Sequence, residues 1–208
     1  MEATTGPVSD PGIGYALLVP VKDPGLAKTR LAAEGRPALV RAFALDAMAA
    51  ARESALVRRV HLVGDDEELT SAARLLGVTP LPDEGEGDLN RALHRAAAAV
   101  GEGGPVAAML GDLPCLIPSD LDRALSAALG AGEAFVPDAE GTGTTLVACA
   151  GPFRSAFGPG SRAAHAALGL AEVGIQAPTL RRDVDTLADL DAARALGLGP
   201  RTRAALEA

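Results

Sequence analysis

Short apolar runs alternate with longer Ala- and Leu-rich stretches along most of the chain. The short runs have the length and aliphatic content of buried strands, whereas the longer stretches repeat apolar residues at helical spacing. The pattern predicts strands at Tyr15–Val21, Val57–Val63, Val78–Leu81, Pro105–Leu110, Ala134–Val136, Thr145–Cys149 and Ile175–Leu180. It predicts helices at Pro37–Ser54, Glu67–Leu76, Leu89–Val100, Ser119–Leu129, Ser161–Leu170 and Leu187–Leu196, with Ser119 as an N-cap.

This alternation is typical of an α/β fold with three layers, α/β/α, in which helices cover both faces of a mostly parallel mixed sheet. No internal repeat or linker interrupts the pattern, so residues 13–208 are expected to form a single domain. The polar stretch 1–12 is expected to be a disordered leader and lacks the features of a signal peptide. Ligands of such sheets bind at the carboxyl ends of the strands, so residues that follow strands are the first candidates for a site.

Composition narrows the range of functions. A chain of 208 residues with 48% hydrophobic content can bury one full core. Its net charge of −8 works against nucleic-acid binding, so a polyanionic partner must be small and bound in a local positive pocket. No segment is long and apolar enough to span a bilayer. Cys115 and Cys149 form no Cys-x-x-Cys pair and are interpreted as small apolar residues of a cytoplasmic protein.

The loop after the first predicted strand carries both lysines of the chain, Lys22 and Lys28, together with Arg30. Elsewhere the chain uses arginine for positive charge, so ammonium groups are concentrated in this loop. Ammonium groups can follow phosphate oxygens during a reaction, which predicts that these three residues bind a triphosphate and stabilise its charge. Ala27 stands where a Walker loop requires glycine, so side chains would hold the phosphates. The alternative is a solvated loop with chance charges.

Three aspartates after predicted strands are candidates for a Mg²⁺ site. Asp112 follows the fourth predicted strand, where a carboxylate is costly unless something satisfies it. Mg²⁺ prefers one or two protein carboxylates and completes its octahedron with water and substrate phosphates. Asp183 and Asp185 alternate in an extended segment, so only one can readily share the metal with Asp112, and we favour Asp185 with Asp183 as the alternative. The competing structural interpretations are that Asp112 is a turn residue and that Asp185 or Thr186 is the N-cap of the following helix.

Two glycine-rich segments form a second candidate anion site. One reads Gly-Thr-Gly-Thr-Thr and leads into a predicted strand, and the other, Phe-Gly-Pro-Gly-Ser, opens a predicted helix. Glycine permits close backbone approach, hydroxyl groups donate hydrogen bonds, and a helix start offers free N–H groups. The two segments together are therefore a candidate site for a second phosphorylated molecule. Taken alone, either segment would more often be an ordinary turn.

Nucleotide-base recognition is less clearly specified. Asn90 follows an acidic loop and could bond a ribose or a base, although a solvated loop capped by Asp88 explains the same residues. His165 lies four residues after Ser161 and could approach the second anion, with core packing as the favoured interpretation. No general base is evident.

Taken together, the motifs resemble the guanylyltransferases of coenzyme F-420 biosynthesis, which act on phosphoenolpyruvate or 2-phospho-L-lactate. The resemblance extends from Tyr15 to Leu196, with the motifs in the right order. They are Val19-Pro-Val-Lys22, Ala27-Lys-Thr-Arg-Leu31, Asp88-Leu-Asn90 with Ala92, Gly111-Asp-Leu-Pro114, Gly141-Thr-Gly-Thr-Thr145, Phe157-Gly158 with Ser161, and Asp183-Val-Asp-Thr186.

The resemblance implies a GT-A-like nucleotidyltransferase fold, GTP as a substrate and Mg²⁺ as the cofactor. It implies an enzyme that joins GMP to the phosphate of phosphoenolpyruvate, giving enolpyruvyl-diphospho-guanosine and pyrophosphate, with 2-phospho-L-lactate as the alternative acceptor. The lysine-poor, Ala/Gly/Arg-rich composition favours phosphoenolpyruvate by analogy with members from high-GC bacteria.

The family's acceptor site maps onto Thr144, Gly158 and Ser161, and its metal site onto Asp112 with the segment Asp183–Asp185. The stretch between Thr144 and Gly158 is slightly shorter than the family pattern, so either Thr144 or Thr145 could touch the acceptor. The rival functions are transfer to a pterin or sugar phosphate and nucleotide binding by a non-catalytic regulator. Expected partners are the small-molecule substrates and a transient hand-off to the downstream transferase.

Overall fold

The computed structural model describes residues 14–22, 37–100 and 104–208. Its described strands form one seven-stranded sheet in the order β3-β2-β1-β4-β6-β5-β7. The strands are β1 (Tyr15–Pro20), β2 (Val57–Val63), β3 (Thr79–Leu81), β4 (Val106–Met109), β5 (Glu133–Pro137), β6 (Thr144–Cys149) and β7 (Ala171–Glu172). The helices are α2 (Pro37–Arg52), α3 (Glu67–Leu75), α4 (Leu89–Val100), α5 (Pro118–Ala131), α6 (Ser161–Ala167), α7 (Pro178–Arg181), α8 (Leu187–Leu196) and α9 (Pro200–Glu207).

The sheet is mixed and mostly parallel, which confirms the predicted α/β architecture. β1 pairs in parallel with β2 and β4, β2 with β3, and β5 with β7. β6 runs antiparallel to both of its neighbours, β4 and β5. Because β6 is reversed, its first residues lie at the same edge of the sheet as the last residues of β1, β4 and β5.

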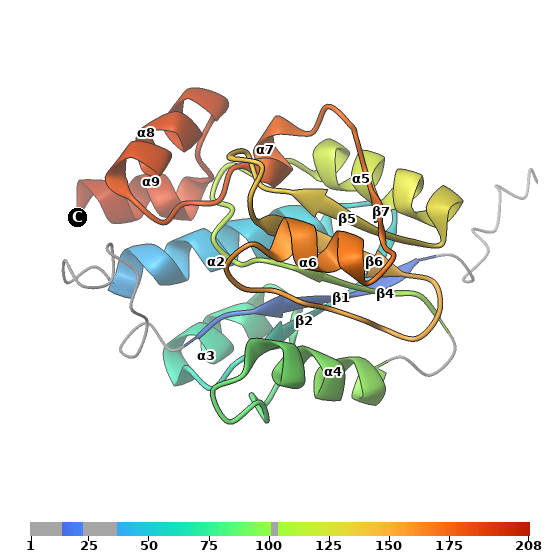
Figure 1. Cartoon of the computed structure of the whole chain (residues 1–208). Coiled ribbons are helices and arrows are strands. Elements are labelled where there is room, and N and C mark those ends of the chain that lie inside the picture. Colours follow the sequence, from blue (N-terminus) through green and yellow to red (C-terminus); the bar gives the residue numbers. More distant parts are fainter. Residues whose placement is uncertain (1–13, 23–36, 101–103) are drawn as a thin grey trace, which may run out of the picture.

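Helices cover both faces of the sheet (Figure 1). Alternate residues of β1 point to opposite faces, so Leu17 and Val19 pack with α2 and α5, whereas Leu18 packs with α4. A third apolar cluster joins α2 to the C-terminal helices and includes Phe43, Leu190 and Leu198. The hydrophobic patterns therefore build three layers around the sheet, as predicted.

Side-chain caps fix where several helices begin. Asp66 accepts a hydrogen bond from Leu69 N (2.6 Å) at the start of α3, and Asp88 accepts one from Arg91 N (3.1 Å) at the start of α4. Thr186 caps α8 through a reciprocal pair of bonds with Asp189. These caps set the orientation of the loops that precede the helices.

Two local predictions are wrong. Ile175–Leu180 is not a strand, because Pro178 starts the short helix α7 and the edge strand is Ala171–Glu172. Ser119 is not an N-cap, because α5 begins one residue earlier, at Pro118. Asp120, which is buried in the first turn of α5, accepts hydrogen bonds from Thr179 N (2.9 Å) and Thr179 Oγ1 (2.7 Å) and so fixes α7 against α5.

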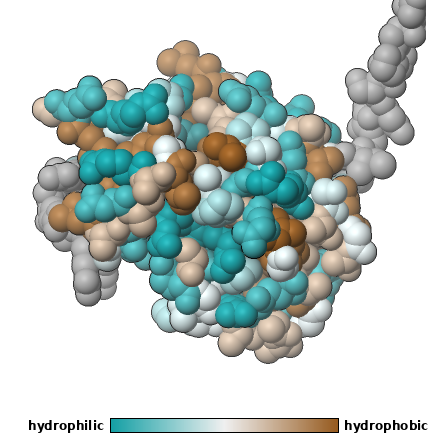
Figure 2. Space-filling model, turned by 90° about the horizontal axis from the view of Figure 1, so that it is seen from above, coloured by the Kyte–Doolittle hydropathy of each residue, from teal (hydrophilic) through white to brown (hydrophobic). Residues whose placement is uncertain are grey.

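The described chain has no broad apolar surface on the face seen from above, where hydrophobic side chains are scattered among hydrophilic ones (Figure 2). None of its helices is long and apolar enough to cross a membrane. Cys115 and Cys149 are both buried and free, as expected for small apolar residues. The predicted leader, residues 1–12, lies outside the described residues.

The C-terminal helix α9 is held on α2 by one buried carboxylate. Asp46 Oδ1 accepts from Arg201 N (3.2 Å) and Asp46 Oδ2 accepts from Thr202 N (2.8 Å), so a residue of α2 caps α9. Gly199 lies directly against this carboxylate, where a Cβ atom would come within 2.3 Å of Asp46 Cγ.

Asp46→Ala should lower the free energy of unfolding by roughly 1–3 kcal/mol, because two backbone N–H groups lose their acceptor in a buried place. Urea denaturation followed by circular dichroism measures the change. Asp191→Asn, at an exposed position of α8, is the control and should leave the midpoint unchanged. An unchanged midpoint in Asp46→Ala would show that this cap contributes nothing to the stability of the fold.

Candidate functional site

The candidate site lies at one edge of the sheet, where β1, β4 and β5 end and β6 begins. Lys22 follows β1, Asp112 follows β4, and Asp138 follows β5. Thr145 O accepts a hydrogen bond from Leu110 N (2.9 Å), which fixes the start of β6 beside the end of β4. The fold therefore brings residues from four separate parts of the sequence to one place.

The turn after β4 presents Asp112 in a tightly packed backbone. A Cβ atom on Gly111 would approach Val21 Cγ2 to 2.8 Å, so only glycine lets this turn lie against the end of β1. Asp112 Oδ1 is buried and has no hydrogen-bond partner. Burial, together with the nearby Asp185 carboxylate, raises the pKa of Asp112 to about 7.

The segment before α8 brings a second carboxylate to Asp112. Val184 N donates to Asp112 O (3.0 Å), which ties the two segments together through their backbones. Asp183 Oδ1 is also buried and without a partner. Burial, and then the Asp112 carboxylate, raise the pKa of Asp183 to about 8.

Asp185 lies nearer the solvent than Asp183. Asp185 is exposed, whereas Asp183 is half-buried, as expected for alternate residues of an extended segment. The pKa of Asp185 is raised by burial and by the neighbouring carboxylates of Asp189 and Glu140. Asp183 is thus the more buried of the two candidates, whereas Asp185 is the carboxylate whose charge raises the pKa of Asp112.

The paired carboxylates fit a divalent cation. Two buried, unpartnered carboxylate oxygens that repel each other are costly, and a bound cation would remove that cost. Within the described residues, no group of three or more Asp, Glu, His or Cys side chains is arranged to hold a metal ion. A cation held here would thus take most of its ligands from water and substrate, which is the coordination that Mg²⁺ prefers.

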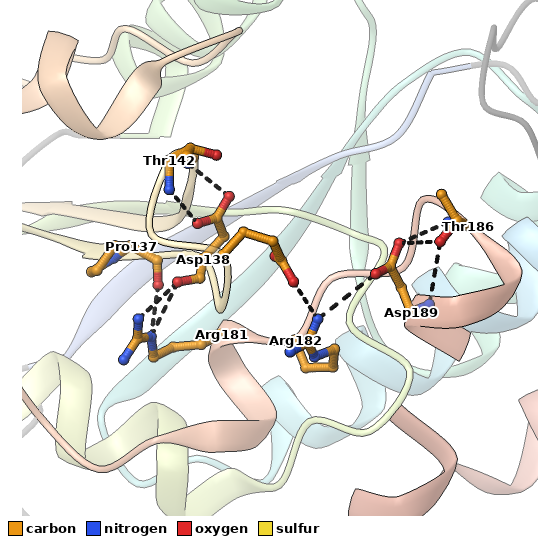
Figure 3. Close-up of polar contacts among 9 residues, drawn as sticks. Pro137, Asp138, Thr142, Arg181, Arg182, Thr186 and Asp189 are labelled. Atoms are coloured by element: carbon orange, nitrogen blue, oxygen red, sulfur yellow. Dashed lines mark hydrogen bonds and ion pairs between the residues drawn. The ribbon is translucent and has the colours of Figure 1, made fainter. Parts of the chain in front are cut away.

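Two arginines hold the loops that flank the carboxylates (Figure 3). Arg181 Nη2 donates to Asp138 O (2.8 Å), and its Nε donates to Pro137 O (3.1 Å). Arg182 Nη1 pairs with Glu140 Oε1 (2.5 Å) and, at 3.8 Å, with Asp189 Oδ1. These contacts connect the loop after β5 to the segment before α8.

The Asp138 carboxylate organises the glycine-rich turn that leads into β6. It accepts from Thr142 N (2.9 Å) and from Gly143 N (2.7 Å) (Figure 3). A Cβ atom on Gly143 would lie 2.4 Å from Asp138 Oδ2, so the turn requires glycine there. Asp138 was not among the residues predicted to belong to the site, although an aspartate a few residues before a glycine is typical of such turns.

The proposed acceptor residues gather around the start of β6 and of α6. Thr144 is buried, and its Oγ1 lies 2.9 Å from His165 Nδ1 on α6. Thr145 points to the other face of the strand, where its Oγ1 is buried without a partner. Gly158 is exposed with φ of 144°, and its carbonyl accepts from Ser161 N (3.0 Å).

Asn90 bonds the loop before α6 with both ends of its amide. Its Oδ1 accepts from Phe157 N (2.8 Å) and Ser155 Oγ (2.9 Å), and its Nδ2 donates to Phe157 O (2.9 Å). This link could not be predicted from the sequence because it joins residues 67 positions apart. A direct contact between Asn90 and a nucleotide stays a prediction.

The cationic part of the site is only partly described. Lys22 is exposed at the end of β1, on the same edge as Asp112. Lys28 and Arg30, predicted to bind a triphosphate with Lys22, lie outside the described residues.

The chain is similar to known proteins over most of its length. The model of the MobA-like NTP transferase domain matches residues 25–191. A phosphoenolpyruvate guanylyltransferase of Thermomonospora curvata is 48% identical, covering 94% of this chain and 90% of that protein. A relative of the same name from Streptomyces avermitilis is also 48% identical, covering 92% and 93%.

Similarity to solved structures confirms the predicted nucleotidyltransferase fold. A nucleotidyl transferase from Methanothermobacter thermautotroptrophicus superposes with a TM-score of 0.59 at 18% identity, covering 89% of this chain and 98% of that one. At this identity the similarity concerns the fold alone.

The carboxylate pair should make the metal-free protein less stable as the pH rises. The raised pKa values mean that the native state binds more protons than the unfolded chain between about pH 4 and pH 8, so the free energy of unfolding falls through this window. Asp183→Asn should therefore raise the free energy of unfolding at pH 8.5 by roughly 1–3 kcal/mol, which appears as a higher melting temperature. The same substitution should have little effect near pH 4.5.

Thermal melts in the presence of a chelator at the two pH values measure this difference. The exposed substitution Asp191→Asn should leave the melting temperature of the protein unchanged at both. An Asp183→Asn variant that is equally or less stable than the wild type at pH 8.5 would contradict the account of a strained carboxylate pair.

Proposed function

The chain belongs to the MobA-like NTP transferases and to the phosphoenolpyruvate guanylyltransferase family, and on this premise we propose how its residues perform guanylyl transfer. The proposed reaction joins GMP from GTP to the phosphate of phosphoenolpyruvate. Enolpyruvyl-diphospho-guanosine and pyrophosphate are the products. The alternative acceptor at the same site is 2-phospho-L-lactate.

The observation that supports this assignment most strongly is the pair of carboxylates at Asp112 and Asp183, each with one buried oxygen that has no hydrogen-bond partner. A protein that only recognised a nucleotide would have no need to keep Asp112 and Asp183 together at the cost of their raised pKa values. Strained, ionisable groups of this kind are typical of sites that act on charged substrates. This argues against the regulator, the rival from a different functional class.

We assign Asp112 and Asp183 as the inner carboxylates for Mg²⁺, with Asp185 as an outer ligand. A bound Mg²⁺ would neutralise charge that develops on the α-phosphate and the leaving pyrophosphate. The chain's own contribution is to hold the carboxylates in place through the Val184 N to Asp112 O hydrogen bond and the capped start of α8.

Lys22, Lys28 and Arg30 are assigned to the triphosphate of GTP. Their charges would offset the repulsion between two anionic substrates and stabilise the pyrophosphate as it leaves. Asn90, at the start of α4, is kept as a candidate for contact with the ribose or guanine. Such contact would require its amide to exchange or share the bonds that it makes with the loop at Phe157.

The chemistry requires no general base. An oxygen of the acceptor's phosphate is already ionised at neutral pH and forms the new bond to the α-phosphorus of GTP. The bond from that phosphorus to the bridging oxygen breaks, and pyrophosphate leaves with the bonding pair. The protein therefore acts by bringing the reactants into line and by stabilising charge.

The acceptor is assigned to Thr144, Thr145, Gly158 and Ser161. Thr144 faces α6, as its contact with His165 shows, whereas the Thr145 hydroxyl lies on the opposite face of β6. This arrangement favours Thr144 as the residue that shares an acceptor with Ser161. We further propose that the product enters coenzyme F-420 biosynthesis through a transient hand-off to the downstream transferase.

Pyrophosphate release should occur with GTP and phosphoenolpyruvate and not with CTP or ATP. A coupled assay with Mg²⁺ that crosses the three nucleotides with phosphoenolpyruvate, 2-phospho-L-lactate and no acceptor measures it. Asp112→Asn should lower kcat by about 10²–10³-fold with the fold intact, because the metal loses a ligand. Asp191→Asn serves as the matched control and should keep full activity.

If pyrophosphate is released only when GTP is combined with 2-phospho-L-lactate, the acceptor is 2-phospho-L-lactate and the proposed reaction is otherwise unchanged. Full activity of Asp112→Asn would contradict the metal assignment. Absence of release in every combination would contradict guanylyl transfer and shift the assignment to a pterin or sugar phosphate acceptor, or to a regulator.

A further inference from the structure

His165 is a fully buried ionisable group on the helix that begins at Ser161. Its side chain is 0% exposed. The ring of Phe157 meets the imidazole edge to face, with centroids 5.1 Å apart, and the ring of Phe135 lies 5.6 Å away. An imidazole enclosed in this way is oriented by its packing and cannot turn freely.

The hydrogen bonds of His165 define where its proton lies. Ala156 N donates to Nε2 (2.8 Å), so Nε2 is an acceptor and carries no proton. In a neutral ring the proton must then be on Nδ1. Burial lowers the pKa of His165 to about 4, so the ring stays neutral at ordinary pH.

The protonated Nδ1 determines the direction of the contact with Thr144. Nδ1 lies 2.9 Å from Thr144 Oγ1, and because it carries the proton, the hydroxyl oxygen must accept. The proton of the Thr144 hydroxyl is therefore not used by the imidazole. Among the described residues the hydroxyl has no second partner.

We propose that His165 is a positioning residue that presents the Thr144 hydroxyl as a hydrogen-bond donor to an anionic oxygen of the acceptor. The chain of bonds runs from Ala156 N–H to Nε2, from Nδ1–H to Thr144 Oγ1, and from the Thr144 hydroxyl to the substrate. An anion can only accept, so a hydroxyl that is set to donate fits a phosphate or carboxylate oxygen. The inference rests on the proposed function and deepens it.

The same contacts connect Thr144 to the loop that carries the other acceptor residues. His165 bonds Ala156, while Asn90 bonds Phe157 from the opposite helix, α4. The residue that follows is Gly158. His165 therefore holds the hydroxyl on β6 and the loop before α6 in one arrangement.

Two substitutions separate the two bonds of the imidazole. His165→Asn can keep a donor near the Nδ1 position and loses the acceptor for Ala156 N. His165→Gln can keep an acceptor near the Nε2 position and loses the donor to Thr144. We expect His165→Gln to raise KM for the acceptor on the order of tenfold, as for one lost bond to a charged group, with KM for GTP unchanged. His165→Asn should restore part of the loss.

A double-mutant cycle with Thr144→Val distinguishes positioning from general packing. If His165 acts through the hydroxyl, His165→Gln should raise KM for the acceptor no further once Thr144 is valine. The proposal would be overturned if the effects of the two substitutions on KM for the acceptor multiplied in the double variant. It would also be overturned if His165→Gln raised KM for GTP as much as KM for the acceptor. An inactive wild type would overturn the proposed function itself, so the two failures are distinguishable.

The tautomer can be tested on the wild-type protein without turnover. Imidazole ¹⁵N NMR of the wild-type protein should show, for the neutral His165 ring, a protonated Nδ1 and an unprotonated Nε2. Comparison with His165→Asn or His165→Gln assigns the signal among the three histidines of the chain. A proton on Nε2 would overturn the proposal, because Thr144 would then have to donate to His165.

Discussion

The backbone hydrogen bond from Val184 N to Asp112 O is the contact on which the site depends. It joins the turn after β4 to the segment before α8 and so places the Asp112 and Asp183 carboxylates in one buried place. Within the described chain, the buried Oδ1 atoms of Asp112 and Asp183 have no hydrogen-bond partner. A fold that brings like charges together without satisfying them carries a local cost that a bound cation would remove.

The surrounding structure resists that repulsion. Arg181 and Arg182 connect the loop after β5 to the segment before α8, and the capping box of α8 fixes the residues that follow Asp185. On the other side of the edge, Asn90 and His165 hold the loop that precedes α6. The charged and the hydroxyl-bearing parts of the site are thus supported by different helices.

The sequence was sufficient to predict the sheet, its covering helices and the strand ends at which the site lies, because these follow from apolar periodicity and the rules of parallel sheets. It was insufficient where a contact joins distant residues. The strand predicted at Ile175–Leu180 is wrong since Pro178 and the Asp120 carboxylate favour α7, and the links made by Asn90 and His165 depend on tertiary packing. Helix α9 was not predicted, because its cap is supplied by Asp46 on another helix.

The central claim is that the paired carboxylates form a site for a divalent cation. Titration calorimetry of Mg²⁺ into the metal-free protein at pH 7, in two buffers with different ionisation enthalpies, tests it most directly. Because Asp112 and Asp183 have pKa values of about 7 and about 8, the cation must displace protons, and the apparent enthalpy should differ between the buffers by an amount that corresponds to roughly one proton released. Equal enthalpies in both buffers, or no binding, would contradict the claim.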